Sequence, residues 1–213
     1  LMNAVIHGHV ACAQLLVDAK ADLERRTNQD LTALELSVTA GQARCAQLLV
    51  DAKANIESSS SNNLTPLMTA AAHGQTACAK VLIDAKANIE ATDNSGCTAL
   101  IMAAMNDHLA CVQLLLDAKA NKDYQIADGR TALVIAVHEN NPACAQALVD
   151  AKANLEIRCN FGATALTSAA EFGQLTCLRL LLEAKADMYA PGHRDATAFI
   201  AAAGNGKHES LQI

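Results

Sequence analysis

The tripeptide Asp84-Ala85-Lys86 recurs along the chain at a constant interval, and this recurrence decides the fold. It returns at residues 18–20, 51–53, 117–119 and 150–152, and residues 183–185 (Glu-Ala-Lys) are a near copy. Each step is 33 residues. Threonine and cysteine share the period, at Thr32, Thr65, Thr98, Thr131, Thr164 and Thr197 and at Cys12, Cys45, Cys78, Cys111, Cys144 and Cys177. Three markers in one phase are typical of stacked supersecondary units.

The composition favours closely packed helices over an aromatic core. Of the 213 residues, 52% are apolar but only 2% are aromatic, and Trp is absent, so Ala, Leu and Val must fill the core. Runs of β-branched residues between turns are too few for an all-β protein. No apolar stretch reaches the length of about 18 residues that spans a membrane. The net charge of −6 argues against general binding of nucleic acids or anionic membranes.

Residues 93–125 show what one unit contains. Asp93, Asn94 and Gly96 favour a turn, and Thr98 is placed to cap a helix. Apolar residues then follow at helical spacing, as Leu100, Ala103 and Ala104 in a first helix and as Cys111, Val112, Leu115 and Leu116 in a second helix that ends near Asp117. Helices of fewer than about ten residues are unstable alone in water. The units must therefore be stabilised by stacking on one another.

This unit resembles the ankyrin repeat. That family's pattern has a D-x-x-G-x-T-P-L-H turn and first helix, an A-A-x-x-G-H connection, a V-V-x-x-L-L second helix and a final G-A-D. The matching residues here are Gly96, Thr98, Leu100, Ala103, Ala104, His108, Leu115, Leu116 and Ala120. Residues 65–67 (Thr-Pro-Leu) keep the family's proline at the first helical position. The resemblance covers the whole chain and implies an all-α solenoid of stacked helix-turn-helix units with short β-hairpin-like turns.

The chain departs from the family pattern at regular positions. Ala replaces the proline in most repeats, and Cys replaces the first Val of the second helix. Lys replaces the Gly that ends this helix, at Lys20, Lys53, Lys86, Lys119, Lys152 and Lys185. Because that Gly normally adopts the left-handed conformation, we expect a positive φ at most of these lysines.

The period predicts a single ankyrin repeat array over residues 1–213. A partial unit at 1–26 and a partial unit at 192–213 flank full units at 27–59, 60–92, 93–125, 126–158 and 159–191. Repeat arrays usually need polar end units for solubility. Neither end of this sequence shows one, which indicates a segment of a longer protein.

The eight cysteines are interpreted mainly as packing residues. Six occupy the buried face of the second helix, where neighbouring helices lie about 8–10 Å apart, too far for a disulfide. Cys behaves there as a small apolar side chain. Cys97 and Cys159 lie in the turns, and we expect them to be the exposed, faster-reacting thiols, without a disulfide partner. Unpaired exposed thiols favour a reducing, intracellular location, in the cytoplasm or the nucleus.

Other residue patterns argue against a catalytic, cofactor-binding or metal site. His9 and His108 precede Cys12 and Cys111 by three residues, but a second close ligand pair is missing. No zinc-protease, Walker, esterase or kinase motif occurs. The acidic column recurs in every repeat, as Glu24, Glu57, Glu90, Asp123 and Glu156, which indicates architecture because a catalytic site occurs once. We expect no enzyme activity, no cofactor and no metal ion.

The remaining function is recognition. The resemblance implies docking on the hairpin tips and on the exposed side of the first helix. In the units from residue 126 onward, the residues at these places that differ from one unit to the next are Arg130, His138, Glu139, Arg158, Phe161, Phe172, His193 and Arg194. Aromatic side chains and Arg are enriched where binding energy concentrates. We predict a contact patch at these residues.

Three functions stay open at this point. The leading hypothesis is a monomeric adaptor that binds another protein, without nucleic-acid binding or membrane insertion. The second is a regulatory or targeting arm of an enzyme whose catalytic domain lies outside the sequence. The third is a structural spacer.

Overall fold

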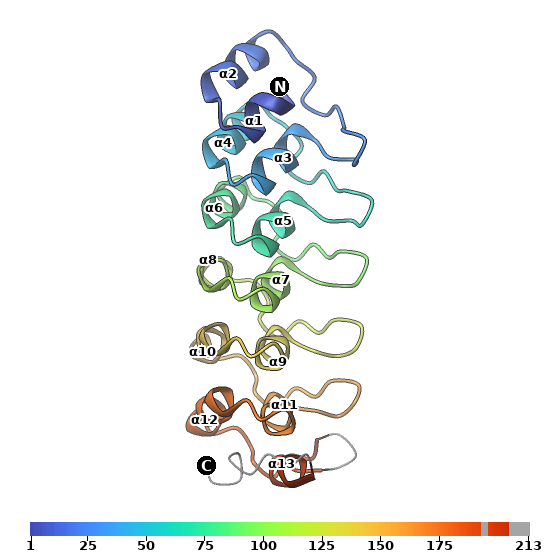
Figure 1. Cartoon of the computed structure of the whole chain (residues 1–213), viewed down its shortest axis with the longest axis vertical. Helices are drawn as coiled ribbons and strands as arrows, with labels where there is room; N and C mark the ends of the chain where they lie inside the picture. Colours follow the sequence, from blue (N-terminus) through green and yellow to red (C-terminus); the bar gives the residue numbers. More distant parts are fainter. Residues whose placement is uncertain (193–195, 205–213) are drawn as a thin grey trace. The chain divides into compact units, whose positions relative to one another are not determined.

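The computed structural model describes residues 1–192 and 196–204, which form helices joined by tight loops (Figure 1). No strand occurs in these residues, so the prediction of an all-helical fold is confirmed. The contacts divide the chain into an N-terminal block, Leu1–Ala103, and a C-terminal block, Ala104–Ile213. The boundary falls within helix α7 (Ala99–Met105).

The N-terminal block contains three helix pairs. They are α1 (Met2–Ile6) with α2 (Val10–Asp18), α3 (Ala33–Thr39) with α4 (Ala43–Asp51), and α5 (Pro66–Ala72) with α6 (Thr76–Asp84). The first helices pack in one row, because α3 contacts both α1 and α5, and the second helices form another row, because α4 contacts both α2 and α6. This is the stacking that the short helices require.

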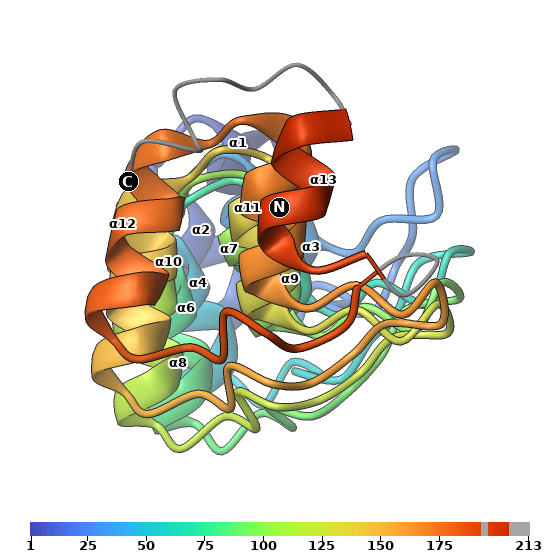
Figure 2. The ribbon, with the colours of Figure 1, turned by 90° about the horizontal axis from the view of Figure 1, so that it is seen from below.

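The C-terminal block repeats this arrangement. Its helices are α8 (Leu109–Asp117), α9 (Ala132–His138), α10 (Pro142–Asp150), α11 (Ala165–Phe172), α12 (Leu175–Glu183) and α13 (Ala198–Gly204). Helices α8, α10 and α12 form one row, and α9, α11 and α13 form the second row (Figure 2). Leu133, Ile135, Leu148 and Leu166 are among the largest fully buried side chains between these rows.

The threonine column begins the first helices. Thr32, Thr65, Thr98, Thr131 and Thr164 each accept a hydrogen bond on Oγ1 from the backbone N–H three residues later, at 3.2–3.4 Å. This bond satisfies one of the N–H groups that a helix leaves open at its start. The recurring Thr therefore sets where each first helix begins, as the sequence predicts.

The lysine column ends the second helices. All six lysines have a positive φ, between 62° and 70°, which confirms the expectation. At α6 the N–H of Lys86 donates to the carbonyl of Ile83 at 2.9 Å, and the N–H of Ala87 donates to the carbonyl of Leu82 at 3.0 Å. These two bonds define a Schellman motif, in which Lys takes the left-handed position that Gly usually occupies.

The acidic column joins successive repeats. Glu24 Oε1 accepts the backbone N–H of Asn55 at 2.8 Å, and Glu156 Oε1 accepts that of Asp187 at 2.9 Å. Each contact joins residues 31 apart, and it recurs with the 33-residue period of the repeats. The interpretation of these carboxylates as architecture is confirmed by this role.

Tight loops connect each helix pair to the next. Backbone hydrogen bonds close these loops, and one joins the two ends of the loop, for example from Ile126 N to Arg130 O at 3.0 Å and from Cys159 N to Ala163 O at 3.0 Å. Gly129 and Gly162 have φ values of 81° and 84°, which a residue with a Cβ adopts only with strain. We call these segments loop 126–130 and loop 159–163.

Candidate functional site: a pocket between two loops and two first helices

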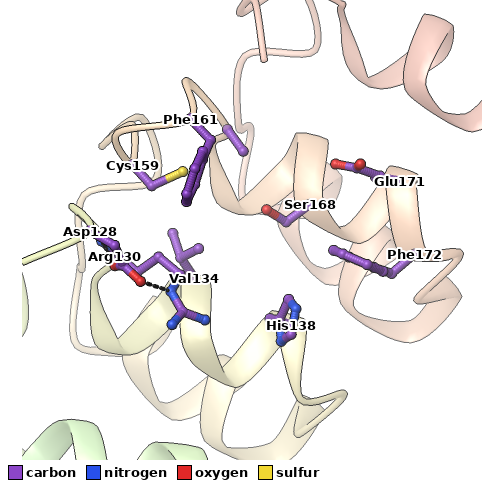
Figure 3. Close-up of a pocket in the computed structure, with 10 residues that line it drawn as sticks. Asp128, Arg130, Val134, His138, Cys159, Phe161, Ser168, Glu171 and Phe172 are labelled. Carbon is purple, nitrogen blue, oxygen red and sulfur yellow. Dashed lines mark hydrogen bonds and ion pairs between the residues drawn. The ribbon is translucent and has the colours of Figure 1, made fainter. Parts of the chain in front are cut away.

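Loop 126–130 fixes the guanidinium group of Arg130. The Asp128 carboxylate accepts the Arg130 backbone N–H on Oδ1 at 3.0 Å and the Arg130 Nε on Oδ2 at 2.8 Å. Both side chains are about two-thirds buried, at 29% and 32% exposure. An ion pair with this geometry and burial orders the Arg130 side chain against the loop (Figure 3).

Loop 159–163 is tied to loop 126–130 by its own backbone. The N–H of Asn160 donates to Asp128 O at 2.8 Å, and Asn160 Nδ2 donates to Ala127 O at 2.9 Å. Behind the loop, Arg158 Nε donates to Gly162 O at 3.0 Å. These bonds hold the loop that carries Phe161, whose side chain remains 65% exposed.

Helices α9 and α11 supply the other wall. Val134 and His138 are four residues apart on one face of α9. On α11, Ser168 precedes Glu171 by three residues and Phe172 by four, so it lies between them on the side of the helix that lines the pocket. The two helices pack against each other. Their faces therefore combine into one surface beside the two loops (Figure 3).

His138 and Phe172 join the two helices at this surface. Their ring centroids are 4.8 Å apart with an interplanar angle of 78°, an edge-to-face arrangement favoured by the quadrupole of the ring. His138 Nδ1 lies 3.0 Å from Glu139 Oε1. Phe172 is 46% exposed, so one part of its ring contacts His138 and another part faces solvent.

Together these elements enclose a pocket of about 310 Å³. Of the residues predicted from sequence, Arg130, His138, Phe161 and Phe172 line it. Glu139 adjoins the pocket through its contact with His138, and Arg158 lies at the base of loop 159–163. His193 and Arg194 lie outside the described residues.

Sequence reasoning missed the other lining residues, which are Asp128, Val134, Cys159, Ala163, Ser168 and Glu171. A usable signal existed for Glu171. It stands at the position that Met105 and His138 take in the two preceding repeats, and it directly precedes Phe172. Cys159 and Ala163 gave no such signal, because the stacking of the two loops brings them to the pocket.

The cysteine predictions require three corrections. Cys97 and Cys159 are buried, with 8% and 7% exposure, although they lie in loops. The backbone of Cys159 packs against Gly129 of the neighbouring loop, which shows that the stacked loops cover each other. Cys12, predicted to be buried, is exposed.

The remaining phased cysteines are buried as predicted. Burial raises the pKa of the Cys78 thiol to about 11. The pKa of Cys144 rises to about 12 through burial and, in addition, through its hydrogen bond to Asp107. None of the eight cysteines forms a disulfide. In the part of the chain that the structure describes, no group of three or more His, Cys, Asp or Glu side chains is arranged to hold a metal ion.

Comparison with known proteins identifies the family. The model of ankyrin repeats, in three copies, matches residues 1–60, 53–126 and 118–192. The chain therefore belongs to the ankyrin repeat family, whose repeats are generally protein–protein interaction modules and are typically non-catalytic. A comparison with curated protein sequences finds no match. None of the described helices is both long enough and apolar enough to cross a membrane.

Solved ankyrin repeat structures share the fold. The ankyrin repeat domain of Bcl-3, a member of the IkappaB protein family, is 27% identical, with a TM-score of 0.87 over 100% of this chain and 97% of that chain. The human ASB11 domain is 21% identical, with a TM-score of 0.86 over 99% and 95%. A domain from Acinetobacter baumannii AYE is 26% identical, with a TM-score of 0.80 over 87% and 97%.

Proposed function

We propose that this chain is a non-catalytic adaptor that binds another protein through the pocket of the C-terminal block. The observation that carries the proposal is the position of Phe161 and Phe172. Both rings are exposed and both line the same pocket. Exposed aromatic side chains in a pocket are where interfaces concentrate their binding energy.

The pocket is also ordered before a partner arrives. The Asp128–Arg130 ion pair and the hydrogen bonds of Asn160 fix both loops, and the Phe172 ring contacts His138. A partner that binds here has few side chains to order, so less of the contact energy is lost to entropy. A volume of about 310 Å³ suits one large side chain of a partner segment.

We further propose a reducing, intracellular location for this adaptor. None of the eight cysteines forms a disulfide, and Cys12 is exposed. Free thiols accumulate in proteins of reducing compartments, because secreted proteins generally pair them.

The double variant Phe161→Ala/Phe172→Ala tests the pocket. Proteins retained from a cell extract by the immobilised wild-type chain are identified by mass spectrometry, and one retained protein is then purified for affinity measurements. We expect the double variant to bind it about 5–30-fold more weakly, equivalent to about 1–2 kcal/mol.

The matched control is Met188→Ala/Tyr189→Ala, which removes two exposed apolar side chains away from the pocket. This control is expected to bind like the wild type, and all three proteins are expected to unfold at similar denaturant concentrations. Equal binding by wild type and Phe161→Ala/Phe172→Ala would place the contact elsewhere. Unfolding of that variant would show that the two rings are core residues.

A further inference from the structure

Among the residues that the structure describes, the charges that line the pocket do not balance. Arg130 is already bonded to Asp128 at 2.8 Å. Glu139 contacts the His138 ring, and the Glu171 carboxylate makes no ion pair or hydrogen bond with any residue that the structure describes. Two carboxylates, those of Asp128 and Glu171, line the pocket beside one guanidinium group, that of Arg130. Glu139 and Arg158 adjoin the pocket without lining it, and their opposite charges offset each other.

The uncompensated carboxylate lies beside exposed aromatic rings. Glu171 lines the same pocket as Phe161 and Phe172, and the three side chains border the same space in Figure 3. The face of a phenyl ring is negative and attracts cations. A pocket that combines aromatic rings with a carboxylate that no described residue pairs therefore favours a cationic group with an apolar stem.

We propose, on the basis of the binding function above, that the partner inserts an arginine side chain into this pocket. Its guanidinium group bonds the Glu171 carboxylate, while its methylene stem lies along Phe161, Phe172 and Val134. Arginine fits better than lysine because its planar guanidinium group stacks on aromatic rings and pairs with a carboxylate through two hydrogen bonds. The partner segment is thus basic, which complements the net charge of −6.

An acidic side chain is the main competing occupant. It would approach Glu171 and Glu139, and its attraction to Arg130 would compete with the Asp128 carboxylate that already bonds this group. Repulsion between like charges and competition for one cation both weaken such binding. The charges of the described residues therefore favour a basic segment over an acidic one.

A peptide selection tests the proposal. A phage-displayed library of random dodecapeptides is selected on the full chain, with prior depletion on the Phe161→Ala/Phe172→Ala variant. We expect the enriched peptides to share an arginine. A fluorescein-labelled synthetic copy of the strongest peptide is then titrated with the wild type, Glu171→Gln and Glu183→Gln. The last variant loses the same charge on α12, outside the pocket.

Replacement of Glu171 is expected to weaken binding of the peptide roughly tenfold, equivalent to about 1.4 kcal/mol, whereas Glu183→Gln leaves it unchanged. Exchange of the peptide's arginine for the uncharged citrulline has a similar effect. Combination of this exchange with Glu171→Gln adds little, because both changes break one interaction. Independent effects of the two changes overturn the proposal.

The selection also separates this proposal from the adaptor function. Pocket-dependent peptides that are acidic, or that lack a basic residue, overturn the arginine proposal and leave pocket binding intact. If selection yields no peptide whose binding depends on Phe161 and Phe172, both proposals fail.

Discussion

The Glu57 carboxylate accepts a hydrogen bond from the backbone N–H of Asn88 at 2.7 Å, across 31 residues of sequence. Asn88 in turn accepts the N–H of Glu90 on its side-chain oxygen at 3.1 Å. The same pair of contacts recurs at Asp123 and Asn154. Each acidic residue therefore ties the turn of the following repeat to its own, so the contact stabilises stacking rather than a single helix.

We expect Glu57→Ala to lower the free energy of unfolding by about 1 kcal/mol, because the Asn88 N–H loses its charged acceptor. Glu57→Gln is the matched control. It keeps an oxygen at the same distance from the backbone and should lose less than half as much. Urea denaturation followed by circular dichroism measures both, and equal losses would show that charge alone matters.

Replacement of Lys86 or Lys119 by Gly is expected to raise the free energy of unfolding by a few tenths to about 1 kcal/mol. Both lysines have φ near 70°, where a residue with a Cβ is strained by about 1 kcal/mol. The lost cation at the helix end and the added entropy of the unfolded chain offset part of this gain. Denaturation midpoints that fall in both variants would contradict this account.

Cys12 should react first with iodoacetamide in the native protein, because it is exposed whereas the other seven cysteines are buried. The buried thiols, including Cys97 and Cys159, should react only in denaturant. Peptide mass mapping after timed labelling at pH 8 gives the order. Rapid native labelling of Cys159 would mean that the two loops separate readily.

The raised thiol pKa values predict a loss of stability at high pH. The unfolded thiols ionise near pH 9, whereas Cys78 and Cys144 ionise at about 11 and about 12 in the folded protein. The stability that these two protonated thiols contribute is therefore fully present below pH 9 and is lost between pH 9 and 12. At pH 10 we expect a loss of about 1 kcal/mol per thiol. In urea titrations, Cys78→Ala/Cys144→Ala should show a smaller change between pH 8 and 10; an unchanged dependence would contradict the assignment.

Asn141→Ala should lower the free energy of unfolding by about 1–2 kcal/mol. Asn141 Nδ2 donates to the carbonyls of Ala104 and Met105 at 2.9 and 3.1 Å, in the preceding repeat, and does not cap its own helix. Gln stands at the equivalent positions 42, 75 and 174, so Asn141→Gln is the control and should retain most of the stability. The midpoints of thermal unfolding of the two variants are compared. Equal midpoints would show that the hydrogen bonds of Asn141 do not stabilise the fold.

The sequence by itself determined the fold, because each element depends on local chemistry repeated in phase. Thr32 and its equivalents begin helices through a bond to a backbone group three residues away. Lys86 ends a helix through two bonds within five residues. A period of 33 then makes each repeat the packing partner of the next. Local rules and a constant spacing were sufficient to predict helices, their ends and their stacking.

Only the tertiary structure decided which side chains meet at the pocket and which cysteines are exposed. Phe161 lies on a loop and Phe172 on α11, and their common pocket depends on how loop 159–163 is hydrogen-bonded to loop 126–130. Cys159 looked exposed because a loop usually faces solvent, yet the neighbouring loop covers it. The position of Cys12 in its column predicted burial, yet the structure leaves it exposed. Burial depends on neighbours in space, which a position within the repeat does not specify.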